Sequence, residues 1–126
     1  MSMKVLLSIK PEYAEKILTG EKRFEYRKVR FSKHVSTVIL YATSPVSRLV
    51  GEFEVDSVLE DVPTKLWEHT KEFSGITREF FRTYFSGRDK AVAIKIGVTK
   101  RYQSPQNPNL GCAKFTPPQS FCYLQD

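Results

Sequence analysis

The sequence contains little of what metal centres, disulfide-bonded proteins and membrane proteins require. Its two histidines, His34 and His69, are too few and too far apart in the chain to indicate a metal site. Its two cysteines, Cys112 and Cys122, could pair, but a reducing cytosol keeps such residues as free thiols. No apolar run approaches the roughly 20 residues of a membrane span, and the first residues lack the apolar core and cleavage site of a signal peptide. We therefore expect a cytoplasmic protein with no membrane contact, no metal and no cofactor.

Composition indicates one soluble globular domain. The chain has 126 residues, of which 40% are hydrophobic and 27% are charged. This length is enough to bury a core without metal or disulfide crosslinks, and both fractions are ordinary for a folded soluble protein. We predict a single domain over residues 1–126.

Positive charge is concentrated at the two ends of the sequence. The net charge is +6. Lysine and arginine outnumber acidic residues nine to four in residues 1–35 and six to two in residues 88–126, whereas residues 36–87 have five basic and eight acidic residues. If the fold brings the two ends together, they form a positive face that attracts phosphate groups. The alternative is that these residues are solvated surface side chains that serve solubility.

Hydrophobic patterning divides the chain into strands and helices. Strands alternate with period two or, at residues 36–43, form a β-branched and nearly all apolar run, and the apolar residues of helices recur every three or four positions. Strands are expected at residues 5–10, shortly after Gly20, and at residues 36–43, 48–59, 91–102 and 119–124. Helices are expected at residues 11–18, 64–72 and 77–84, and residues 103–118 should be irregular. Pro11 suits the first turn of a helix, Gly20 suits its C-terminal cap, and Gly51 should mark a bend or bulge in its strand.

Too few helices separate these strands for a doubly wound parallel sheet. The pattern instead favours an α+β, mainly β fold, with about six strands curled into a small mixed β-barrel and helices flanking it.

Several motifs resemble those of the ASCH domain family. They are Ser8-Ile9-Lys10-Pro11, the later segment Gly20-Glu21-Lys22-x-x-Glu25-x-Arg27, Tyr41-Ala42-Thr43-Ser44-Pro45, Gly51-Glu52-Phe53 and Pro118-Gln119-Ser120-Phe121-Cys122-Tyr123. The likeness runs from about Val5 to Leu124 and is to the small single-domain ASCH proteins of archaea, bacteria and phages. It implies a PUA-like fold, in agreement with the predicted barrel, and a cleft beside the first helix for RNA or nucleotides.

The resemblance also bears on catalysis. One bacterial branch of the family removes the acetyl group of N4-acetylcytidine with a Lys, a Thr and a Glu, and another branch is associated with ribonuclease activity. By motif position the lysine corresponds to Lys22 and the threonine to Glu25, while the glutamate falls after His69, where Glu72 is the nearest match. A carboxylate at position 25 can act as a general base for water but cannot replace an attacking hydroxyl. This departure favours recognition over that deacetylation.

Charge pattern and resemblance together select a set of candidate site residues. The candidate ligand-binding residues are Ser8, Lys10, Lys22, Glu25, Arg27, Ser44 and Arg48. If the protein is an enzyme, the candidate catalytic residues are Lys22, Glu25 and Glu72. Each has an alternative interpretation, since lysines are usually solvated, a serine can bond its own backbone, and Ser44 with Arg48 can form an ordinary turn and a solvated arginine.

Glu25 and Arg27 are two residues apart on a predicted strand, so their side chains share a face about 7 Å apart along it. In a functional site, Glu25 would orient or deprotonate a ligand group while Arg27 held a phosphate or carboxylate. The alternative is a structural ion pair.

Aromatic residues follow two patterns. Phe24, Tyr26 and Phe31 lie among basic residues, as in sites that stack single-stranded bases, although such rings also fill barrels. The remaining aromatics recur at helical spacing, and we assign them to the core between helices and barrel. They are Trp67, Phe80, Phe81, Tyr84 and Phe85.

Three functions remain in competition. The first is binding of RNA or a nucleotide in a basic cleft beside the first helix. The second is hydrolysis of a modified nucleoside or of RNA, and the third is a protein-interaction module in transcription control, which needs a partner surface outside the cleft. The sequence leaves the oligomeric state open.

Overall fold

The computed structural model describes residues 3–108 and 121–124. These residues form one six-stranded sheet in the order β2-β5-β4-β3-β1-β6. The strands are β1 (Met3–Ile9), β2 (Phe24–Arg27), β3 (Val35–Ala42), β4 (Arg48–Asp61), β5 (Ala91–Gln106) and β6 (Phe121–Leu124). The helices are α1 (Pro11–Thr19), α2 (Pro63–Thr70), the 3-10 helix η1 (Lys71–Phe73) and α3 (Arg78–Tyr84). Their order along the chain confirms the order that periodicity predicts.

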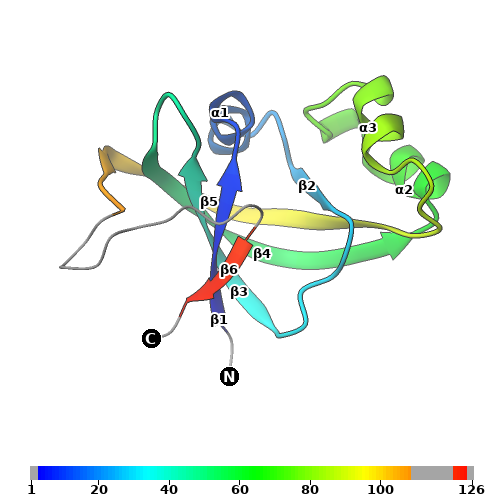
Figure 1. Ribbon diagram of the computed structural model, residues 1–126, viewed down its shortest axis with the longest axis horizontal. Coiled ribbons are helices and arrows are strands. Elements are labelled where there is room, and N and C mark those ends of the chain that lie inside the picture. The colour runs from blue at the N-terminus through cyan, green and yellow to red at the C-terminus, as the bar shows by residue number, and fades with distance from the viewer. Residues whose placement is uncertain (1–2, 109–120, 125–126) are drawn as a thin grey trace.

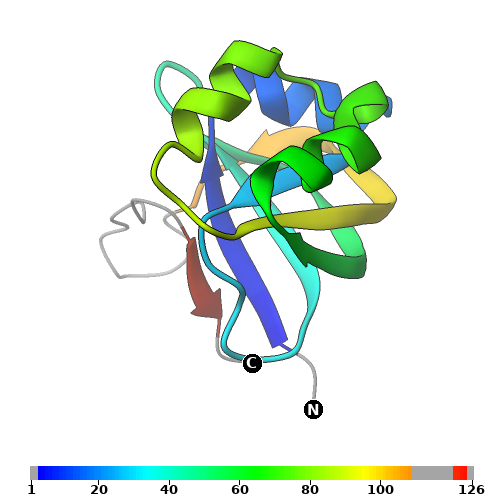
Figure 2. The same cartoon turned by 90° about the vertical axis from the view of Figure 1, so that its right-hand side faces the viewer.

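The sheet is mixed and curls into a half-barrel, with β2 and β6 as its two edges (Figure 1). Strands β1 and β3 pair in parallel, while the other neighbouring strands are antiparallel. Figures 1 and 2 show α1, α2 and α3 together at one end of the half-barrel. This is the mainly β, PUA-like architecture that the sequence predicts. No helix in residues 3–108 or 121–124 is both long and apolar enough to cross a membrane.

Helix α1 begins and ends where its sequence predicts. Pro11 occupies the first turn, where its missing N–H costs no hydrogen bond. Gly20 adopts a left-handed conformation with φ +89°, and its N–H donates to the carbonyl oxygen of Ile17 at 3.2 Å. The helix buries Ala14 and Ile17 against the sheet. The chain then turns at once into β2, which places the charged strand beside the helix end.

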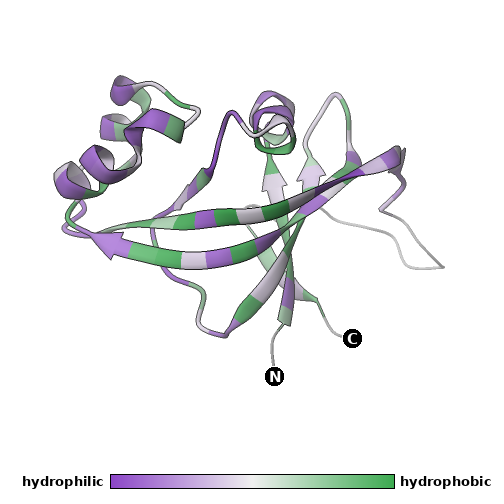
Figure 3. Ribbon diagram, turned by 180° about the vertical axis from the view of Figure 1, so that it is seen from behind, coloured by the Kyte–Doolittle hydropathy of each residue, from purple (hydrophilic) through white to green (hydrophobic). Residues whose placement is uncertain are grey.

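Strands β4 and β5 form a long antiparallel ribbon along which polar and apolar residues alternate (Figure 3). Gly51 lies at an irregularity in this ribbon, as predicted, and a Cβ there would lie 2.6 Å from the carbonyl oxygen of Lys100. The prediction of an irregular segment from residue 103 is wrong for its first four residues, because β5 continues to Gln106, opposite Leu49. The pairing of Gln106 with Leu49 thus extends the strand beyond Pro105, a residue that strands disfavour.

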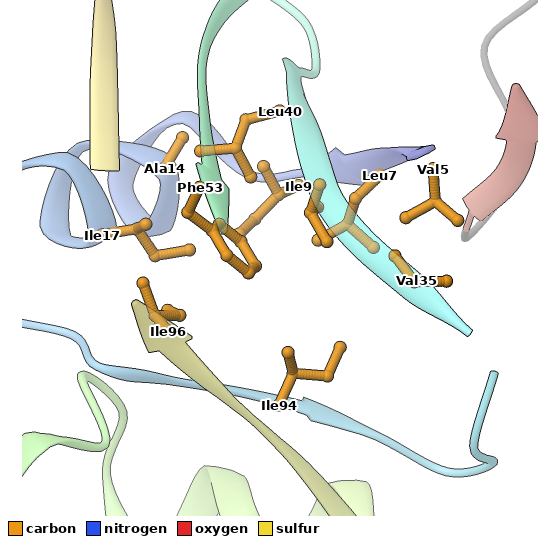
Figure 4. Close-up of a cluster of buried hydrophobic side chains, with 11 residues drawn as sticks. Val5, Leu7, Ile9, Ala14, Ile17, Val35, Leu40, Phe53, Ile94 and Ile96 are labelled. Carbon is orange, nitrogen blue, oxygen red and sulfur yellow. The ribbon is translucent and has the colours of Figure 1, made fainter. Parts of the chain in front are cut away.

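The main core lies inside the curl of the sheet, where Phe53 of β4 sits among the buried side chains of α1 and the strands (Figure 4). Its buried members are Val5, Leu7, Ile9, Ala14, Ile17, Val35, Val38, Leu40, Phe53, Ile94 and Ile96. A second cluster packs α2 and α3 against the sheet through Leu66, Phe81 and Phe85, which meet Tyr26 of β2. The assignment of all five helical aromatics to the core is wrong for Phe80, which is 40% exposed.

The edges of the sheet approach each other at β2 and β6. The ring of Phe31, after β2, lies 4.9 Å from the ring of Phe121, and the Arg27 guanidinium lies 5.9 Å from the same ring. The hydroxyl of Tyr123 accepts a hydrogen bond from the backbone N–H of Ser32 at 2.8 Å. Through these contacts β6 partly closes the barrel next to β2.

Candidate functional site

Five of the predicted ligand-binding residues line one cavity of about 140 Å³ between β1, β2, α1 and α3. Ser8 lies near the end of β1, and Lys10 directly follows that strand. Glu25 and Arg27 belong to β2, and Lys22 lies two residues before it. We call this cavity the charged pocket. In the described part of the chain it is lined by Ser8, Ile9, Lys10, Tyr13, Lys22, Glu25, Tyr26, Arg27, Ile76, Phe80 and Tyr84.

Lys22 is a buried cation, with only 2% of its surface exposed. Its Nζ donates to the carbonyl oxygen of Ser74 at 2.6 Å and lies 5.0 Å from the centre of the Tyr26 ring. Burial lowers the pKa of Lys22 from its ordinary value, because desolvation disfavours the charged form, while the Glu25 carboxylate opposes this shift. A buried lysine in this setting is not the ordinary solvated side chain of the alternative interpretation.

Gly75 makes room for the aliphatic part of Lys22. It has φ +70°, and a Cβ at this position would lie between 2.6 and 2.9 Å from the Cβ, Cγ and Cδ atoms of Lys22. Only glycine combines this backbone conformation with such a close approach. The turn after η1 therefore lies directly on the lysine side chain and seals it from solvent.

Glu25 lies between two cations at the floor of the pocket. Its Oε1 is 4.0 Å from the Nζ of Lys22, and its Oε2 is 3.4 Å from Nη1 of Arg27. The exposed fraction of the side chain is 11% for Glu25 and 14% for Arg27. Neighbouring Glu25 and Arg27 do share a face, as predicted, and the three charges together leave a net charge of +1. We call Lys22, Glu25 and Arg27 the charged row. Its two outer groups donate hydrogen bonds, and the carboxylate between them accepts them.

Tyr26 fixes β2 to α2 behind the charged row. Its hydroxyl lies 2.6 Å from Oγ1 of Thr70, whose own hydrogen goes to the carbonyl oxygen of Leu66 at 2.8 Å. Tyr26 is therefore the donor in this pair, and burial raises its pKa to about 12. Of the three aromatics that could have stacked bases, Tyr26 is buried in the second core cluster and Phe24 and Phe31 pack against the two clusters. These three rings therefore fill the interior of the fold, which is the second of the two interpretations given for them.

One wall of the pocket is aromatic, and sequence reasoning assigned two of its three rings to the core. Phe80 lies between Tyr13 of α1 and Tyr84, with ring centres 5.9 Å and 6.4 Å away. Burial raises the pKa of Tyr84, while the nearby Arg27 acts in the opposite direction. A signal for this wall exists in the sequence, because aromatics at positions 80, 81, 84 and 85 form two stripes on one short helix, and a core needs only one.

The structure does not bring three of the candidate residues to the charged pocket. Ser44 is exposed in the turn after β3, and Arg48 is exposed at the start of β4, where its guanidinium donates to the carbonyl oxygen of Ser47. Glu72 is exposed on η1. Cys122 is an exposed thiol on β6. Cys112 and Ser120 lie outside the described residues.

The chemistry available in the pocket follows from this geometry. Lys10, Lys22 and Arg27 supply donors and positive charge, Glu25 supplies an acceptor or a base, and the rings supply apolar faces. Every fully buried side-chain nitrogen or oxygen in the described residues has a hydrogen-bond partner. In the same residues no group of three or more His, Cys, Asp or Glu side chains could hold a metal ion.

Fold and motifs together define the class of protein. The family model of the ASCH domain matches residues 7–100, and the chain belongs to this family. The crystal structure of ASCH from Zymomonas mobilis superimposes with a TM-score of 0.86 at 26% identity, covering 98% of this chain and 88% of that one.

Two relatives illustrate the range of proteins that carry similar sequence. The ASCH domain-containing ribonuclease of Zymomonas mobilis is 28% identical over 127 residues, which cover 95% of this chain and 83% of that protein. The large ribosomal subunit protein uL22 of Ureaplasma parvum serovar 3 is also 28% identical, over 104 residues that cover 82% of this chain. This stretch is only 33% of the length of the Ureaplasma protein.

Proposed function

We propose that this protein binds RNA by holding one nucleotide unit in the charged pocket. The observation that carries the proposal is the position of Glu25 between Lys22 and Arg27, on the floor of a cavity with an aromatic wall. Recognition of an unpaired base needs hydrogen bonds to its edge and a ring to stack on, and recognition of the backbone needs positive charge. The pocket offers all three within about 140 Å³.

The individual roles follow from the chemistry of each side chain. Arg27 and Lys10, which are less buried than Lys22, would contact phosphate or base oxygens. Glu25 would accept a hydrogen bond from a base amino group or a ribose hydroxyl. The similarity to a ribonuclease from Zymomonas mobilis, at 28% identity over 95% of this chain, supports RNA as the partner.

The test measures, by fluorescence anisotropy, the binding of a fluorescein-labelled single-stranded RNA. Its length of about eight nucleotides lies within the usual site size of proteins that bind single strands. Affinity should fall steeply between about 50 and 200 mM salt, because each neutralised phosphate releases counterions. Arg27→Ala should weaken binding at least roughly 10-fold and reduce the salt slope by about 0.7.

Arg101→Ala is the matched control, since it removes the same charge from an exposed arginine whose partner is Glu15 on the outer side of α1. It should change the affinity less than about 2-fold, as expected for a charge outside the site. Absence of RNA binding at low salt, or equal effects of the two variants, would show that the charged pocket is not an RNA site.

A second candidate function is hydrolysis of RNA, favoured by the same Zymomonas relative and by the lowered pKa of Lys22. Glu25 would then take a proton from the water that attacks the phosphorus, the P–O bond to one ribose oxygen would break, and that oxygen would leave with a proton from solvent. Lys22 and Arg27 would stabilise the charge that develops on the phosphate. Turnover of RNA, and of N4-acetylcytidine in parallel, should be measured for the wild type and Glu25→Gln. Loss of roughly 100-fold or more of turnover with retained binding supports an enzyme, whereas no product from the wild type excludes it for these substrates.

A further inference from the structure

We propose that Phe80 and Tyr84 form a stacking surface for the base next to the one in the charged pocket. The substrate class is then a single-stranded RNA segment of at least two nucleotides rather than a free nucleoside or a duplex. This inference rests on the proposed function and extends it from the pocket to its rim.

The two rings form one continuous aromatic surface on α3. They are one helical turn apart, their centres are separated by 6.4 Å, and their planes differ by only 11°. Phe80 is 40% exposed, whereas Phe81 and Phe85 of the neighbouring stripe are 3% exposed each. A helix in a folded domain normally turns its large aromatics inward, so an exposed Phe80 beside the half-buried Tyr84, at the charged pocket, is suited to an apolar ligand surface.

Phe80 differs from the other exposed phenylalanine in the described residues. Phe73 is 38% exposed, but the guanidinium of Arg23 lies 4.3 Å from the centre of its ring. The contacts of Phe80 are instead with Tyr13 at 65° and with the parallel ring of Tyr84, both of which belong to the wall of the charged pocket. The stacking surface is therefore continuous with the pocket, and Phe73 is not part of it.

Positively charged side chains lie next to this surface, at the place where the RNA backbone would leave the pocket. The Nζ of Lys28 lies 5.0 Å from the centre of the Tyr84 ring, and Arg88 donates to the carbonyl oxygen of Lys28 at 3.2 Å. Both side chains are exposed. A phosphate that links one base in the pocket to another on the rings would pass between Arg27 and Lys28, and both are cations.

The size of the pocket argues for an unstacked base. Its volume of about 140 Å³ equals roughly that of five water molecules, below the roughly 300 Å³ of pockets for drug-sized ligands. One base fits such a space, but a base pair does not. A base that enters the pocket leaves the stack of its neighbours, and the rings at the rim replace the stacking that the adjacent base loses.

The experiment compares ligands that reach the rim with ligands that do not. Wild type, Phe80→Ala, Phe80→Trp and the control Phe73→Ala are titrated with the four nucleoside 5′-monophosphates and with the labelled single-stranded RNA of about eight nucleotides. The same RNA annealed to its complement is titrated alongside. Thermal melting of each variant verifies that it is folded.

The expected result is specific to Phe80 and to single strands. Phe80→Ala should weaken the single-stranded RNA roughly 5- to 150-fold, the range for one lost stacking contact. Because Phe80 also lines the charged pocket, the monophosphates should weaken too, but several-fold less than the single-stranded RNA. Phe80→Trp should restore affinity, and Phe73→Ala should resemble wild type. The duplex should bind more weakly than the single strand.

Three outcomes overturn the inference. Equal effects of Phe80→Ala and Phe73→Ala show that the rings do not stack a base. An equal loss for monophosphates and RNA makes Phe80 part of the pocket wall alone and leaves the proposed function intact. Failure of the wild type to bind either RNA or monophosphates rejects the proposed function together with the stacking surface.

Discussion

The Nζ of Lys22 and the carbonyl oxygen of Ser74 lie 2.6 Å apart, although 52 residues separate them in the chain. This contact joins the approach to β2 to the turn between η1 and α3. It brings the charged floor of the pocket, which comes from β2, to its aromatic wall, which comes from α1 and α3. The position of the site therefore depends on how closely this turn packs on one lysine.

Gly75→Ala should destabilise the protein more than Gly87→Ala does. Both glycines have positive φ, +70° and +77°, so both variants pay about 1–2 kcal/mol for a left-handed alanine. Only at position 75 does the added Cβ meet Lys22, within 2.6 Å, and that overlap should cost about 1–3 kcal/mol more. Urea unfolding of the two variants measures the difference, and equal losses would mean that Lys22 moves aside freely.

Glu25→Gln should destabilise the protein by about 2–3 kcal/mol, because it leaves the buried Lys22 and the partly buried Arg27 without a counter-charge. Glu60→Gln is the matched control, since its ion pair with Arg30 is exposed and should contribute less than about 1 kcal/mol. Chemical denaturation measures both free energies. Similar values for the two variants would indicate that the charged row is as solvated as a surface pair.

Thr70→Val and Tyr26→Phe should show coupling in a double-mutant cycle. Thr70→Val keeps the shape of the side chain but leaves the buried hydroxyl of Tyr26 without its acceptor at 2.6 Å, at a cost of about 1–3 kcal/mol. In the double variant no hydroxyl is left unsatisfied at position 26, so its loss should be smaller than the sum of the single losses by at least about 0.5 kcal/mol. Additive losses would contradict a direct hydrogen bond between the two side chains.

Alkaline pH should destabilise the protein through Tyr26. Its pKa in the folded state is raised to about 12, above the value of about 10 in an unfolded chain. As the pH rises above about 10, the unfolded state loses this proton first. The free energy of unfolding contributed by the hydroxyl is therefore fully present below about pH 10 and is lost as the pH rises towards about 12.

The pH dependence of Lys22 has the opposite sign. Its folded-state pKa is lowered, so the unfolded state holds the proton longer and stability rises with pH up to the unfolded value of about 10.4. Comparison with Tyr26→Phe separates the two groups, because that variant keeps Lys22. Between about pH 9 and 11 the wild type should lose stability relative to Tyr26→Phe. Parallel pH profiles of the two proteins would exclude Tyr26 as the titrating group.

The order of strands and helices was predictable because each signal is local. Pro11 and Gly20 set the ends of α1, and the β-branched, nearly all apolar run at residues 36–43 identifies a buried strand. The segment from Lys22 to Arg27 was equally predictable as a candidate site, since its charges follow a helix end and lie on one strand and its approach. These features need no knowledge of distant contacts.

Features that depend on distant contacts could not be predicted. The burial of Lys22 requires the turn at Gly75, more than fifty positions away, and nothing near Lys22 in sequence indicates it. For the same reason, helical spacing could not decide which aromatic stripe of α3 faces the core and which faces the pocket. Glu72, chosen by motif position, lies on the exposed side of η1, because the short segment around it has no strong periodicity.

The packing of Gly75 on Lys22 has a consequence for motion. The segment from α2 to α3 rests on the rest of the fold through the second core cluster and the contacts of the turn at Gly75, and we expect it to open as a separate cooperative unit while the main core stays closed. Its amides should then exchange with solvent earlier than those of β3, by a local route that exposes Lys22 to water. A ligand in the charged pocket contacts both units at once, so its binding would appear as slower exchange in α3.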